Sequence, residues 1–132
     1  MHLAPCTPSP SLISRGQDVF PSPSAWAGED IFRQLLEARR DRGLELRIAQ
    51  NAAKPGSSPE TEELEEAGAE VRNVNFTALV GTGILHTKLW VVDGKHFYVG
   101  SANFDWRSLT EVKEVGVLVT DCPCLAADMA KI

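Results

Sequence analysis

A histidine and a lysine separated by one residue are the side chains of this sequence best suited to catalysis. His86 and Lys88 are followed by Asp93, Ser101 and Asn103, all within 18 residues. On a β-strand, His86 and Lys88 point to the same face, because alternate residues of a strand share a face. A neutral imidazole can attack phosphorus to form a phosphohistidine, while an ammonium group holds the phosphate oxygens. The spacing therefore predicts phosphodiester chemistry with His86 as the nucleophile.

The remaining polar residues of this stretch complete a phosphate site. Lys88, Ser101 and Asn103 can donate hydrogen bonds to the non-bridging oxygens, where charge concentrates in the transition state. The imidazole attacks through one nitrogen, so the other must keep its proton, and a carboxylate holds it best. Because an ammonium group neutralises the phosphate, we expect no cofactor and no divalent metal.

A hairpin is predicted to bring the motif together. Asp93-Gly94 is a strong signal for a two-residue turn between two β-rich segments. In that register Val92 pairs with Lys95, and His86 lies opposite Ser101. Directly opposed side chains on one face stand ~4.5–5.5 Å apart at Cβ, so we expect the serine hydroxyl beside the imidazole.

Other chemical interpretations of the sequence are weaker. Gly100-Ser101-Ala102-Asn103 lacks the second glycine of a nucleophile elbow, which disfavours a serine esterase. Cys122, Cys124 and a histidine make an incomplete zinc ligand set. Gly81-Thr82-Gly83 precedes a strand rather than a helix, so we interpret it as a turn and not a phosphate loop.

The elements that must position these residues follow a strand–helix–strand order. We expect helices over 28–42, 58–68 and 122–132, and strands over 44–49, 71–76, 85–92, 96–101 and 114–120. This order predicts an α/β domain, a mixed β-sheet with flanking helices. The arginines at the end of the first helix favour a solvated terminus that complements the helix dipole over a phosphate patch.

Composition bounds the remaining possibilities. The chain has 132 residues and a net charge of −5, which disfavours a simple electrostatic nucleic-acid binder. No apolar run reaches the ~18–20 residues of a membrane span, and no signal-peptide core is visible. Five prolines among residues 1–27 predict a Pro/Ser-rich disordered tail ahead of a domain over 28–132. With Cys6, the cysteine count is three, so at least one thiol is free or pairs outside the chain.

The pattern His86-x-Lys88-x4-Asp93-x6-Gly100-Ser101-x-Asn103 resembles the HKD motif of the phospholipase D superfamily. The runs 83–93, 101–110 and 122–126 are similar to the phospholipase D three/four group. The resemblance implies half of a two-lobed phospholipase D-like fold, with Glu114 as the carboxylate that orients His86. It also implies hydrolysis of phosphodiesters in phospholipids or in single-stranded DNA and RNA, the latter as a 5′-exonuclease.

Members of that group are membrane-anchored glycoproteins of the endoplasmic reticulum, Golgi and lysosome, with lumenal catalytic domains. The resemblance therefore implies a lumenal location. The glycosylation sequon at Asn75 fits this setting. Trp106 can stack on a nucleobase or pack in the core, and the sequence does not separate the two.

This chain carries one HKD motif where the family has two. In the family the second histidine protonates the leaving oxygen. We therefore expect a partner half, supplied by a longer chain or by a homodimer. The alternative is a truncated, catalytically inactive fragment that acts only as a binding partner.

Overall fold

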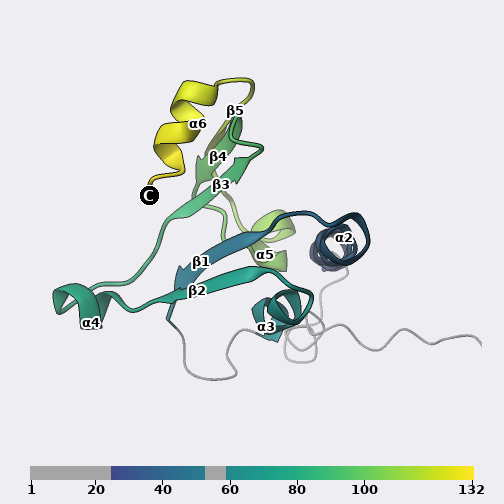
Figure 1. Cartoon of the computed structure of the whole chain (residues 1–132), viewed down its shortest axis with the longest axis horizontal. Coiled ribbons are helices and arrows are strands. Elements are labelled where there is room, and N and C mark those ends of the chain that lie inside the picture. The colour runs from purple at the N-terminus through teal and green to yellow at the C-terminus, as the bar shows by residue number, and fades with distance from the viewer. Residues whose placement is uncertain (1–24, 53–58) are drawn as a thin grey trace, which may run out of the picture. The chain divides into compact units, whose positions relative to one another are not determined.

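The computed structural model describes residues 25–52 and 59–132, which form an α/β chain with two small sheets and flanking helices (Figure 1). The elements in chain order are α2 (Trp26–Arg42), β1 (Arg47–Asn51), α3 (Pro59–Glu66), β2 (Glu70–Val74), α4 (Phe76–Val80), β3 (Lys88–Val92), β4 (His96–Gly100), α5 (Trp106–Thr110), β5 (Gly116–Val119) and α6 (Pro123–Met129). The predicted fold class is confirmed. The tail predicted over residues 1–27 lies almost entirely outside the described residues, and so does Ser58, the first residue of the helix predicted over 58–68.

Two compact units make up the chain. The first holds α2, α3 and the starts of β1 and β2, while the second holds the ends of these strands and every element from α4 onward. The chemistry-bearing motif lies entirely in the second unit.

Helix α2 starts two residues before its predicted first residue. Its buried face carries Gly28, Phe32 and Leu36, spaced four residues apart, whereas Ile31 is exposed. This spacing places the three residues on one side of a helix. Gly43 ends the helix in the left-handed region, with φ 67°, and its N–H donates to the Ala38 carbonyl.

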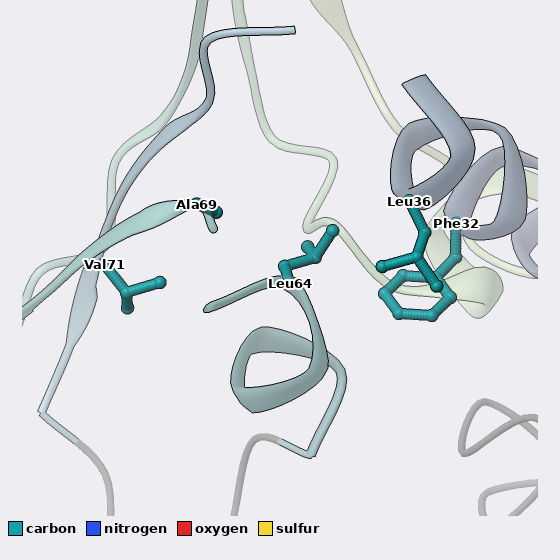
Figure 2. Close-up of a cluster of buried hydrophobic side chains, with 5 residues drawn as sticks. All are labelled: Phe32, Leu36, Leu64, Ala69 and Val71. Carbon is teal, nitrogen blue, oxygen red and sulfur yellow. The ribbon is translucent and has the colours of Figure 1, made fainter. Parts of the chain in front are cut away.

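The first unit has its core between α2, α3 and the β1–β2 pair. The buried side chains are Phe32, Leu36, Leu64, Ala69 and Val71. Figure 2 shows Leu64 between the two α2 residues and the two residues that follow α3. At 2% exposure, Leu64 is the most deeply buried of the five.

Strands β1 and β2 run parallel, as the strand–helix–strand order predicts. The Glu70 N–H donates to the Leu46 carbonyl at 2.9 Å, and the Ala52 N–H donates to the Val74 carbonyl at 2.8 Å. Both strands therefore advance in the same direction along one ladder.

The second unit contains the antiparallel sheet β3–β4–β5. Helix α6 packs against β3 and β4, and Figure 1 shows it beside this sheet. Within the described part of the sheet, Phe97 is the one buried side chain. It shares a face with Leu89, Val91 and Val99, because the register pairs Val91 with Phe97 and Leu89 with Val99.

The predicted hairpin register is wrong by one residue. Asp93 and Gly94 do form the turn, with φ 53° and 62°, and the Lys95 N–H donates to the Val92 carbonyl. However, Val92 pairs with His96. The carbonyl of Lys95 accepts the Cys122 N–H at 2.8 Å instead of closing the strand pair. A contact from the start of α6 thus converts a two-residue loop into a three-residue loop.

Two short helices were missing from the prediction, and each begins at a capping side chain. Asn75 Oδ1 accepts the Ala78 N–H at the start of α4, where a strand was expected to continue through residue 76. Asp105 Oδ1 accepts the N–H groups of Arg107 and Ser108 at the start of α5. Asparagine and aspartate are favoured caps because their oxygens satisfy unpaired amides of the first turn.

Candidate active site

His86 lies in the unpaired segment that leads into β3, not on the strand itself. Strand β3 begins at Lys88, so the expectation of a strand through residues 85–92 is wrong at its start. The Leu85 N–H donates to Asn51 Oδ1 at 3.0 Å, so a side chain at the end of β1 takes this amide. Gly83, with φ 98°, turns the backbone just ahead of it. The imidazole of His86 is exposed.

Lys88 is held beside His86 by its own ammonium group. Its Nζ donates to the His86 carbonyl oxygen at 2.6 Å. The lysine is half-buried and the histidine is exposed, so neither is sealed inside the hydrophobic interior. A cation therefore lies close to the backbone of the candidate nucleophile, where it can meet an approaching phosphate.

Ser101 and Glu114 form the most complete hydrogen-bonded group of the site. The Ser101 hydroxyl donates to Glu114 Oε2 at 2.5 Å. The Val115 N–H donates to Ser101 Oγ at 3.0 Å, and the Ser101 N–H donates to the Val115 carbonyl at 2.9 Å. A hydrogen bond from His86 to Glu114 is not among those of the described residues, and the orienting role of Glu114 stays a prediction.

Ser101 does not lie opposite His86, contrary to the predicted register. Lys88 pairs with Gly100 and Leu89 with Val99. Continued by two residues, this register would place Ala102, not Ser101, opposite position 86. The serine therefore meets the carboxylate of Glu114 across the β4–β5 ladder rather than the imidazole across the hairpin.

Asn103 and Asp93 occupy very different places. Asn103 is exposed and lies in the loop between β4 and the capped start of α5. Asp93 occupies the hairpin turn at the far end of β3, roughly 17 Å from Lys88 at ~3.3 Å per strand residue. The structure therefore does not bring Asp93 to the other motif residues, and its left-handed conformation marks it as a turn residue.

Asn51 is the positioning residue that the sequence did not reveal. It lies 34 positions before Leu85, and no local pattern connects the two. The cap at Asp105 could have been predicted from the sequence. An aspartate is a common residue at the start of a helix, where its side chain accepts the N–H groups two and three residues further on.

Other predicted features are located as follows. Asn75 is exposed at the start of α4. Cys122 and Cys124 have their sulfurs 3.7 Å apart without a disulfide, and Trp106 is half-buried at the first position of α5. Over residues 25–52 and 59–132, no three histidine, cysteine or acidic side chains are grouped to hold a metal ion. In the same ranges no helix has the length and apolar character needed to cross a bilayer.

Comparison with known proteins gives consistent matches. The family model described as "PLD3/4, PLD-like domain" matches residues 10–132. A protein named "5'-3' exonuclease PLD3" from Xenopus laevis is 51% identical over 111 residues, which cover 83% of this chain and 22% of that protein. The Homo sapiens protein of the same name is 50% identical over 113 residues, with the same coverage.

More distant matches extend the comparison. "Phospholipase D Z" from Dictyostelium discoideum is 44% identical over 119 residues, covering 88% of this chain and 28% of that protein. Among solved structures, the phospholipase D family member Nuc from Salmonella typhimurium superposes with a TM-score of 0.65 at 24% identity, covering 77% of this chain and 65% of that one. This chain thus spans between about a fifth and a third of the length of these curated relatives.

Proposed function

The chain belongs to the PLD3/4 group of phospholipase D-like domains, and from this premise we propose that it is one half of a phosphodiesterase that acts through a phosphohistidine on His86. The observation that carries the proposal is the contact between Lys88 Nζ and the carbonyl of His86, 2.6 Å long. It places the ammonium group of Lys88 against the backbone of His86, whose side chain is exposed, and nucleophilic attack on a phosphodiester requires both groups.

In the proposed reaction, a ring nitrogen of His86 attacks phosphorus, a P–N bond forms and the bond to the leaving oxygen breaks. Lys88 and Asn103 donate to the non-bridging oxygens as charge accumulates on them. Water then attacks the phosphohistidine, the P–N bond breaks and the imidazole is regenerated. The carboxylate of Glu114 accepts a hydrogen bond from the N–H of the second ring nitrogen, which keeps its proton, and so fixes the attacking tautomer.

The leaving oxygen needs a proton that this chain does not supply from a second motif. We propose that a second His-x-Lys motif, in a longer chain or in a second copy of this one, donates it as general acid. The fraction of the relatives' length spanned here, 22% for the PLD3 exonucleases, supports a complementary half. The second candidate function is that of an inactive fragment that binds a partner.

We propose single-stranded nucleic acid as the substrate and a lumenal compartment of the secretory pathway as the location. The relatives at about 50% identity carry the name 5'-3' exonuclease, which supports a nucleic-acid substrate. The name of the 44% identical relative keeps phospholipids as the second substrate class. The exposed sequon at Asn75 supports the lumenal location.

The proposal is tested with bis(p-nitrophenyl) phosphate, whose leaving group departs as an anion without help from a general acid. This substrate isolates the step assigned to His86 from the missing half. We expect nitrophenolate release by the purified chain, its loss in His86→Asn, and retention in His96→Asn, a matched change at a strand histidine outside the site. Equal rates for all three proteins, or no release by the unmodified chain, would favour the binding role.

A second assay separates the substrate classes. A 5′-labelled single-stranded oligonucleotide and vesicles of phosphatidylcholine are offered to the chain under the same conditions. Stepwise shortening of the oligonucleotide from its 5′ end supports the exonuclease proposal. Release of choline without shortening replaces it with phospholipid hydrolysis.

A further inference from the structure

The hydroxyl of Ser101 is fully engaged by the protein itself. It donates to Glu114 Oε2 at 2.5 Å and accepts the Val115 N–H at 3.0 Å. A serine hydroxyl has a single proton to donate. A hydrogen bond from that proton to a substrate phosphate would therefore require the bond to Glu114 to break.

The carboxylate is the stronger of the two acceptors within reach of this proton. The Val115 carbonyl lies 3.3 Å from Ser101 Oγ, well beyond the 2.5 Å to the carboxylate oxygen. Hydrogen bonds to an ionised acceptor are also shorter and roughly twice as strong as neutral ones. Distance and charge both assign the proton to Glu114.

The backbone on both sides of this bond is fixed. The β4–β5 ladder pairs Gly100 with Gly116, and the bond from the Ser101 N–H to the Val115 carbonyl extends it by one step. The ring of Tyr98 covers both glycines so closely that a Cβ on either would overlap it. Ser101 is thus anchored at the end of a tightly packed ladder, next to the loop that carries Glu114.

We infer that Ser101 is a positioning residue, which holds one carboxylate oxygen of Glu114 so that the other is presented to the imidazole of His86. This inference rests on the proposed function and revises the role expected from the sequence, in which Ser101 binds phosphate. The phosphate is then bound by Lys88 and Asn103, and Ser101 contributes to the reaction only through the carboxylate.

The bond is tested first without any enzymatic activity. Urea unfolding is measured for Ser101→Ala, Glu114→Ala and the double variant. A lost hydrogen bond to a charged group is worth about 1.5 kcal/mol, or roughly a tenfold rise in the unfolding equilibrium constant. We expect the double variant to show about the same tenfold rise as either single variant, because each removes the same bond. Multiplication of the two effects, to roughly 100-fold, would overturn the inference.

The positioning role is tested with the chromogenic diester. We expect Ser101→Ala to lower kcat about tenfold with an unchanged KM, Ser101→Thr to restore kcat because it keeps the hydroxyl, and Ser101→Ala to have no further effect in a Glu114→Ala background. Asn103→Ala is the contrasting variant, because it removes a direct phosphate donor and is expected to raise KM as well as lower kcat. A raised KM and unchanged kcat in Ser101→Ala would overturn the inference. If the unmodified chain has no activity, the proposed function fails and the positioning role fails with it, while the unfolding cycle still decides whether the bond between Ser101 and Glu114 forms.

Discussion

Replacement of Asn51 by alanine is expected to loosen the segment that carries His86. Asn51 Oδ1 accepts the N–H of Leu85, the residue directly before the histidine, at 3.0 Å. Both residues are half-buried, so water can partly replace the lost acceptor. The expected cost is therefore that of an ordinary hydrogen bond, about 1 kcal/mol, rather than that of a buried orphan amide. This corresponds to about a fivefold change in the local opening equilibrium.

The assay is amide hydrogen exchange followed residue by residue. We expect the protection of the Leu85 amide to fall about fivefold in Asn51→Ala, while the amides of β4 keep theirs. Asn51→Asp is the matched control, because it retains an oxygen in the accepting position and should preserve protection. Unchanged protection at Leu85 in the alanine variant would refute the assignment of Asn51 as the anchor of this segment.

Three further changes test the first unit. Leu64→Ala is expected to lower the free energy of unfolding by about 2–3 kcal/mol in urea titrations, since Leu64 is 2% exposed and leaves a cavity. Gly68→Ala should cost about 2 kcal/mol in the same assay, because φ is 97° and the new Cβ would lie 2.6 Å from Arg39 Nη2. Arg33→Gln should raise the pKa of Asp30 toward 3.8 in a carboxyl NMR titration, because the hydrogen bond from Arg33 is the main cause of its lowered pKa.

The first two changes each have a control variant, and the third predicts the direction in which stability changes with pH. Leu118→Ala removes the same atoms at a 69% exposed position and should change stability little. Gly43→Ala imposes a positive φ with no atom within 4 Å of the new Cβ, so it should cost less than Gly68→Ala. Because the pKa of Asp30 is lowered on folding, its contribution is present above pH 3.8 and is lost as pH falls further. A contribution that instead grows on acidification contradicts the pairing with Arg33.

The sequence predicted the elements whose signals are local. The helix predicted over 28–42 forms over 26–42 and ends at the glycine that was expected to stop it, and the turn at Asp93-Gly94 forms with the backbone that the dipeptide favours. The register failed because the Lys95 carbonyl is taken by the Cys122 amide, a contact across 27 positions. No strand pattern near the turn carries information about that partner.

The candidate site divides in the same way. The motif formed by His86, Lys88 and Asn103 could be recognised because its residues lie close together in the sequence. In the structure the Lys88 ammonium group contacts the backbone carbonyl of His86. The acceptor for Leu85 and the partner of the Ser101 hydroxyl were not, because both bonds join separate elements. Such contacts depend on where each strand ends and on which residues it pairs with. The alternation of side chains along a strand does not determine either of these.

Detection of a phosphoryl group on His86 tests the central claim most directly. The chain is mixed with bis(p-nitrophenyl) phosphate, quenched in alkali, which preserves a P–N bond, and digested for mass spectrometry. We predict a nitrophenyl-phosphoryl adduct on the peptide that contains His86, and no adduct in His86→Asn. An adduct on Ser101, or turnover without any adduct on His86, would contradict the account.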